Sequence, residues 1–271
     1  MDKIWNADFT KEVPDGKAGT QAQWGIFYRD QRGRWKRLTE AEGNEFSYNP
    51  EIKETNPIGQ ESKEDVIMAF NTSFGKDIII KKGKPNYEFF HEFELYQPTG
   101  DNAKLEIVIA EFFYSEKNGA TGHHKYLAYL FDTTCTVDSS NKTDGKLTVN
   151  FKQAGDRVIG VIYRTDDGAG EQAYEFTPCT EIPVEKIALS DKADTDGVSI
   201  APGKKAYIAV SFSPLGCPFD FNVEVEEGKE NICTAERVRQ SIIINGLEEG
   251  TATVTLSSSG VDKEIEVTVT L

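Results

Sequence analysis

The stretch EIEVTVT, residues 264–270, alternates polar side chains with branched apolar ones at seven consecutive positions. Strict alternation with a period of two is typical of a β-strand that buries one face. Similar runs, rich in Val, Ile, Thr and Ser, recur through roughly the last ninety residues: 187–189, 206–212, 221–225, 241–244 and 251–256. Six or seven short strands separated by turns predict a β-sandwich of the immunoglobulin type.

The chain upstream of this region also predicts strands, with one helix among them. The strands are expected at 24–28, 35–38, 46–48, 66–70, 77–80, 105–113, 126–131, 146–151 and 156–163. The helix begins at Pro85, which suits a first helical turn, and ends before Pro98. Its apolar side carries Phe89, Phe90, Phe93 and Tyr96. This spacing predicts a helix packed on a sheet.

The size and composition predict a folded, acidic protein of about two domains. The chain has 271 residues, of which 38% are hydrophobic and 11% aromatic, so a disordered chain is not expected. Its net charge is −15. Affinity for DNA comes largely from Lys and Arg, so a chain this acidic is a poor candidate for gripping nucleic acid. The negative charge suits a surface along which DNA moves without being bound.

The cysteines and the N-terminal residues bear on where the protein works. Cys135, Cys179, Cys217 and Cys233 form no CxxC pair, and isolated reduced thiols fit an intracellular site of folding. Residues 1–6 show no basic stretch followed by an apolar core, so export by a signal peptide is not expected. No apolar run approaches the ~18 residues of a membrane helix, and no membrane insertion is expected.

The sequence predicts neither an enzyme nor a cofactor or metal protein. It contains no G-x-S-x-G, H-E-x-x-H, Walker A or G-x-G-x-x-G motif. His123 and His124 lie in a Gly/Asn/Lys-rich segment without further ligands at metal-binding spacing. The stretch 191–197 superficially resembles a calcium loop, but Pro202 stands where the bidentate Glu is required.

A basic cluster and a long polar loop are the two features that point to contacts with other chains. Residues 29–37 hold five Arg or Lys around Trp35, but alternation on a hairpin divides them between two faces. A subunit contact with an acidic neighbour is favoured over nucleic acid. From 43 to 74 the chain predicts the two extended arms of a long hairpin, and loops of this length are often functional.

Four segments carry a resemblance to a known family. They are YNPEI at 48–52, IGQE at 58–61, YEFF at 87–90 and QPTGDNA at 97–103. In this order, and across roughly residues 20–178, the chain resembles the major tail tube proteins of long-tailed bacteriophages that infect Gram-positive bacteria. The segments 184–189, 200–203 and 244–254 resemble a bacterial Ig-like module of the second group. The chain departs from that module at 221–224, where the family usually has Trp and a Ser-Ser-Asn run.

The resemblance implies a mainly β fold in three parts: a tail tube β-sandwich or barrel with one flanking α-helix at 1–178, a linker at 179–183, and an Ig-like sandwich at 184–271. It implies that copies join sheets into hexameric rings, which stack into a tube. The Ig-like domain is expected to decorate the exterior, and because a bulky exterior domain would hinder a contracting sheath, a non-contractile tail is favoured. The partners implied are other copies, tape measure and terminator proteins, and double-stranded DNA passing non-specifically during ejection. The location implied is the virion tail, assembled in the host bacterial cytoplasm.

The long loop is the site that the resemblance implies for self-assembly. Its candidate residues are Tyr48, Pro50, Ile52, Pro57, Ile58 and Gly59. We expect residues 52–61 to be mobile in the free subunit and to become ordered on stacking. The alternative is a cell-surface or virion adhesion module whose Ig-like domain binds carbohydrate or protein.

Overall fold

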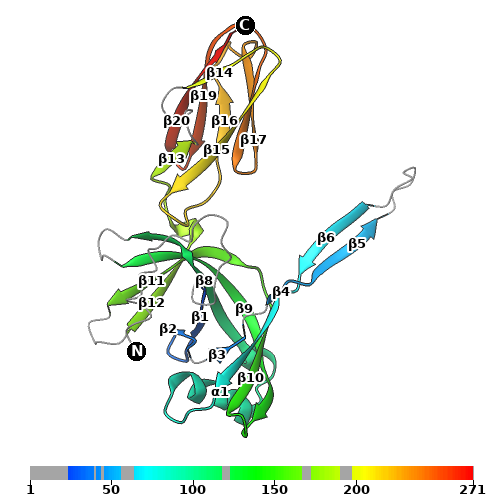
Figure 1. Ribbon diagram of the computed structural model, residues 1–271, viewed down its shortest axis with the longest axis vertical. Coiled ribbons are helices and arrows are strands. Elements are labelled where there is room, and N and C mark those ends of the chain that lie inside the picture. The colour runs from blue at the N-terminus through cyan, green and yellow to red at the C-terminus, as the bar shows by residue number, and fades with distance from the viewer. Residues whose placement is uncertain are drawn as a thin grey trace. The chain divides into compact units, whose positions relative to one another are not determined.

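The computed structural model describes residues 24–39, 41–43, 46–55, 64–117, 123–166, 172–189 and 197–270. The chain divides into two compact units, Met1–Phe176 and Thr177–Leu271 (Figure 1). Both are mainly β, as the sequence predicts, and the described residues contain one α-helix. No helix in these ranges is long and apolar enough to cross a membrane.

The first unit contains a ten-stranded sheet in the order β2-β1-β8-β9-β10-β7-β3, with β4 on β7, and with β11 joining β9 to β12. The strands are β1 (Trp24–Arg29), β2 (Trp35–Arg37), β3 (Ala41–Glu42), β4 (Phe46–Ser47), β7 (Ser73–Ile79), β8 (Lys104–Lys117), β9 (His124–Asn141), β10 (Lys146–Gln153), β11 (Val158–Asp166) and β12 (Gln172–Pro178). The predicted turn between β1 and β2 is confirmed, and the two strands pair antiparallel.

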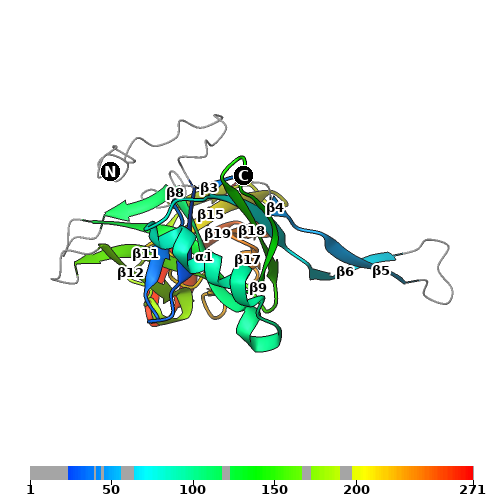
Figure 2. The ribbon, with the colours of Figure 1, turned by 90° about the horizontal axis from the view of Figure 1, so that it is seen from below.

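The main core of this unit lies between one sheet face and the helix α1 (Pro85–Tyr96), which Figure 2 shows lying across the strands. Alternation in β10, which matches the strand predicted at 146–151, buries Leu147, Val149 and Phe151 completely. Phe90 is also fully buried, and its ring packs edge-on against Phe151. The helix is therefore confirmed, and so is its packing on a sheet.

Two details of the predicted elements are wrong. Tyr96 is 79% exposed because it is the last helical residue, beyond the part of α1 that the sheet covers. The segment 115–125 was expected to link two strands, whereas β8 runs on to Lys117 and β9 begins at His124. A register shift between Glu111 and Ser115 lets the pairing continue where the alternation of apolar residues breaks down.

A second core covers the opposite face of the sheet near β1, β8 and β9. Its buried members include Phe27, Val108 and Tyr174. Because Ile26 and Tyr28 belong to the main core, β1 is buried on both faces and reads as a continuous apolar run. The strand β12, which the sequence did not predict, contributes Tyr174 to this core.

The second unit is a sandwich of two four-stranded sheets around one shared core. One sheet has the order β13-β15-β18-β17 and the other β14-β20-β19-β16. The strands are β13 (Lys186–Leu189), β14 (Val198–Ile200), β15 (Lys205–Ser213), β16 (Asn222–Val225), β17 (Cys233–Val238), β18 (Ser241–Gly246), β19 (Gly250–Ser258) and β20 (Val261–Val269). The alternation in β20 buries Ile265, Val267 and Val269, which confirms the prediction. The strands β14 and β17 were not predicted.

Candidate assembly surfaces

A two-stranded arm is the first candidate surface. The strands β5 (Pro50–Thr55) and β6 (Glu64–Phe70) form a sheet of their own, outside the ten-stranded one. Figures 1 and 2 both show this arm leaving the first unit next to β4. At its root, Asn71 N–H donates to Asn49 O at 3.1 Å, and Asn49 Nδ2 donates to Asn71 O at 3.3 Å. An isolated two-stranded hairpin is marginally stable in water, so this arm is expected to gain from a partner.

The structure describes half of the predicted loop residues: Pro50 and Ile52 lie on this arm, and Tyr48 comes just before it. Tyr48 and Ile52 are each 54% exposed, and Pro50 is exposed too. Pro57, Ile58 and Gly59 lie outside the described residues. Residues 52–55 pair with β6, which fits the long hairpin predicted for this segment, and residues 56–61 lie outside the described residues. The mobility of 52–61 in the free subunit stays a prediction.

Phe70, the aromatic residue of β6 at the root of the arm, was not predicted as a surface residue from the sequence. Phe70 is 54% exposed and, with Tyr48 and Arg157, lines a cleft of about 670 Å³. The signal that could have found it is the aromatic residue at the end of a predicted strand, opposite Pro50 in a long hairpin.

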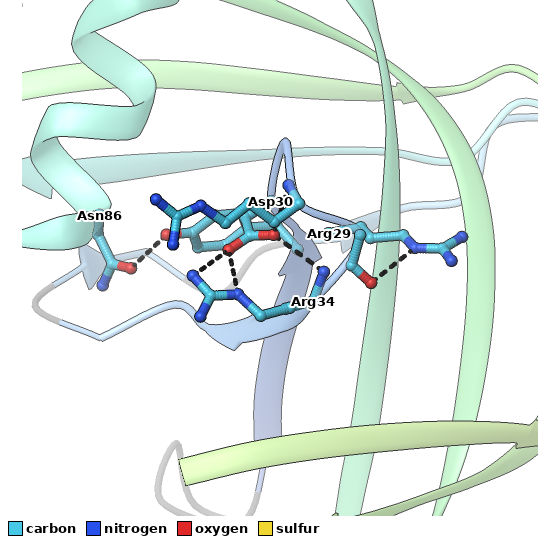
Figure 3. Close-up of polar contacts among 7 residues, drawn as sticks. Arg29, Asp30, Arg34 and Asn86 are labelled. Carbon is cyan, nitrogen blue, oxygen red and sulfur yellow. Dashed lines mark hydrogen bonds and ion pairs between the residues drawn. The ribbon is translucent and has the colours of Figure 1, made fainter. Parts of the chain in front are cut away.

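The turn between β1 and β2 is the second candidate surface. Asp30 organises it, because its Oδ1 accepts the backbone N–H groups of Arg32 and Arg34, each at 2.9 Å. Its Oδ2 accepts Arg34 Nε at 3.1 Å, as Figure 3 shows. Burial alone would raise the pKa of the Asp30 carboxyl, but the hydrogen bonds from Arg34 and Arg32 bring it below its ordinary value.

The basic residues of this hairpin are divided between two faces, as predicted. Arg29 pairs with Glu106 at 2.6 Å, and Arg37 lies 5.1 Å from the ring centroid of Phe112. Arg32, Arg34 and Lys36 instead line a cleft of about 610 Å³ between the turn and α1. Arg37 is partly buried, and this burial lowers the pKa of its guanidinium. Arg32 is exposed to solvent.

The helix supplies the opposite wall of this cleft. Tyr28 Oη donates to Asn86 Oδ1 at 3.0 Å, and this buried hydrogen bond joins β1 to the helix. Asn86 Nδ2 also donates to Thr39 O at 2.7 Å. Gln31 Nε2 donates to Glu92 Oε2 at 2.5 Å across the cleft. At the end of the helix, Leu95 and Tyr96 are 62% and 79% exposed.

Among the described residues, no three His, Cys, Asp or Glu side chains gather in a way that could hold a metal ion. His91 contacts Glu94 at 2.8 Å on the helix and stacks on Tyr87. Residues 191–196 of the calcium-like loop lie outside the described residues. The four cysteines are all free thiols, and burial raises the pKa of Cys135 to about 12.

Comparison with known proteins gives no family. No family model matches the chain, and no curated protein matches it. Among solved structures, domains 4 and 5 of the S-layer protein SbsC are 23% identical, with a TM-score of 0.29 over 43% of this chain and 66% of that one. A longer SbsC structure is 15% identical, with a TM-score of 0.27 over 89% of this chain and 43% of that one.

A phage protein is also among the similar structures. The Dit protein of SPP1, described as a hub adsorption apparatus in Gram-positive infecting phages, is 8% identical, with a TM-score of 0.26 over 89% of this chain and 82% of that one. TM-scores this low carry no argument, so the function is argued below from the residues of the chain itself.

Proposed function

We propose that this chain is a structural virion protein that assembles with copies of itself into the stacked hexameric rings of a non-contractile phage tail tube. The observation that carries the proposal is the β5–β6 arm, which pairs with none of the other described strands and exposes Tyr48, Ile52 and Phe70. Exposed strand edges and apolar side chains on a marginal hairpin favour association with another chain. The resemblance of residues 20–178 to tail tube proteins supports the same proposal.

In this role the second unit decorates the outside of the tube, and the acidic net charge keeps DNA from binding as it passes through the lumen. The further partners are tape measure and terminator proteins, and the location is the virion tail. The proposal assigns the protein no catalytic role, no cofactor and no membrane insertion.

The test is electron microscopy and light scattering on the concentrated full chain, beside an arm-deleted variant. The variant replaces residues 51–69 with Asn-Gly, since Pro50 and Phe70 face each other in register and a two-residue turn can join them. We expect rings or tubes from the full chain and folded monomers from the variant. Because β5 and β6 pair only with each other among the described strands, the rest of the first unit is expected to keep its fold. Normal tubes without the arm would contradict the proposal.

A second variant tests the division of labour between the two units. Removing residues 182–271, which leaves β12 complete, is expected to leave tube formation intact and to thin the outline of the tubes. Loss of assembly in this variant would show that the second unit is part of the wall.

One observation favours the alternative of adhesion by the second unit. Tyr207 on β15 is 70% exposed on the outer face of its sheet, and Val238 on β17 is 44% exposed. An exposed ring on the outer face of a sheet suits stacking on a sugar or on an apolar protein surface. Binding of the full chain to purified host cell walls, lost on Tyr207→Ala, would favour adhesion; unchanged binding would count against this face.

A further inference from the structure

The cleft at the root of the arm, here named the root cleft, has the composition of a protein-docking site. Two exposed aromatic side chains, Tyr48 and Phe70, line it at the base of the arm. Arg157 also lines it, and its Cζ atom lies 4.6 Å from the ring centroid of Tyr129. Aromatic residues and Arg are enriched in protein interfaces. With a volume of about 670 Å³, the root cleft has room for large side chains of another molecule.

The last two residues of α1 present a complementary group of apolar side chains. Leu95 and Tyr96, here named the helix end, are the most exposed large apolar residues described in the first unit. The helix stops after them, where Gln97 takes a left-handed conformation and donates its N–H to Phe93 O at 3.1 Å. Both side chains are therefore available to enter a cleft on another molecule.

The helix end and the root cleft are separate patches of the first unit. Among the residues that the structure describes, the cleft that Leu95 and Tyr96 line shares no residue with the root cleft. Closed rings are built from heterologous contacts, in which one patch of each copy meets a different patch of the next. The first unit therefore carries both halves of such a contact.

The polar groups of the two patches also complement each other. The last turn of α1 contains no basic residue, and Lys142 reaches the Glu94 carboxylate of this turn at 3.7 Å. The final carbonyl groups of a helix have no donors within the helix and carry partial negative charge. Arg157 of the root cleft supplies a cation for them, and Asp156 of the same cleft supplies an acceptor for the Tyr96 hydroxyl.

We propose that the helix end of one copy inserts into the root cleft of a second copy. The Tyr96 ring then packs against Tyr48 and Phe70, and the last carbonyl groups of the helix face Arg157. This inference rests on the proposed function and names the partner surface at the root of the arm. Each copy keeps one helix end and one root cleft for its two neighbours, as a closed ring requires.

The first test compares exposed-to-alanine variants of the full chain. Tyr96→Ala removes the ring of the helix end, and Phe70→Ala removes a wall of the root cleft. The matched control is Tyr114→Ala, which changes an exposed tyrosine on β8 of the same unit that lines neither cleft. Near-ultraviolet circular dichroism checks that every variant is folded, and light scattering gives the concentration at which assembly starts.

We expect Tyr96→Ala and Phe70→Ala each to raise that concentration about tenfold or more, because aromatic residues dominate the binding energy of interfaces. The double variant should be little worse than either single variant, since both changes remove the same contact. The control is expected to assemble as the natural chain does.

The second test detects the contact itself. Leu95→Cys and Ala154→Cys are placed in separate chains, because Leu95 belongs to the helix end and Ala154 is an exposed residue that lines the root cleft. A short bismaleimide is expected to give covalent dimers in an equal mixture of the two variants. Each variant treated alone controls for the four natural thiols.

The outcomes separate this docking from the proposed function. Assembly of Tyr96→Ala or Phe70→Ala at the natural concentration overturns the docking and leaves the proposed function standing. A mixture that cross-links no more than the single variants does the same. A natural chain that stays monomeric overturns both.

Discussion

Asn86 is expected to hold the helix on the sheet through its hydrogen bonds. Replacing it shows how much these bonds add to the free energy of unfolding of the first unit. The side chain is 7% exposed and takes part in three hydrogen bonds: with Tyr28 Oη, Thr39 O and Thr39 Oγ1. A hydrogen bond of this kind contributes about 1 kcal/mol net. Asn86→Ala is therefore expected to lower the free energy of unfolding of the first unit by about 3 kcal/mol. Tyr28→Phe, which removes one of the three bonds, should lower it by about 1 kcal/mol.

The two units can be followed separately because of where the tryptophans lie. All three, at positions 5, 24 and 35, belong to the first unit, and Trp35 is buried. Urea unfolding followed by tryptophan fluorescence therefore reports the first unit within the full chain. The matched control is Asn231→Ala, an exposed Asn of the second unit that bonds Glu248, and it should leave this transition unchanged.

The double variant separates a direct bond from two independent effects. Because Tyr28 and Asn86 share one hydrogen bond, the combined loss is expected to fall short of the sum of the single losses by about 1 kcal/mol. Fully additive losses, or an Asn86→Ala change below about 0.5 kcal/mol, would refute the role given to Asn86.

Two further substitutions test burial in the first unit. Burial lowers the pKa of Lys76 to about 8 from an ordinary 10.5, so between these values the unfolded chain binds more protons, and the natural protein should gain stability as pH rises. In Lys76→Met the free energy of unfolding, measured with urea from pH 7 to 10.5, should rise by up to about 3 kcal/mol less than in the natural protein. The same pH dependence in both proteins would contradict the prediction. A Cβ on Gly25 would meet Phe112 Cζ at 2.3 Å. Gly25→Val should therefore lower the free energy of unfolding by about 1–3 kcal/mol, seen as a lower urea midpoint. An unchanged midpoint would show that the Phe112 ring moves aside without cost.

The sequence predicted best those elements whose residues repeat with a clear period. The helix from Pro85 and the strands at 146–151 and 264–270 have one buried face each, so alternation or helical spacing marks them. The strands β14 and β17 were missed because they are short or carry charged residues such as Glu236 and Arg237. The strand β12 was missed because its place in the sheet depends on pairing with β11.

The candidate surfaces were predicted only in part, because they depend on contacts between distant segments. The division of the basic cluster follows from strand alternation and was predicted correctly. The wall that α1 gives to the cleft was not, since nothing local to 29–37 indicates that Leu95 and Tyr96 lie beside it. The pairing of Pro50 with Phe70 likewise needs the register of the arm, which the polar sequence between its strands does not fix.

The long strands at the centre of the first unit have a mechanical consequence. The strands β8 and β9 have 14 and 18 residues, and at ~3.3 Å per residue the longer one spans roughly 60 Å. They run antiparallel over most of their length, so a force along them loads many hydrogen bonds in shear at the same moment, instead of opening them one by one. Stretching of single molecules between the ends of this pair is therefore expected to show high mechanical resistance.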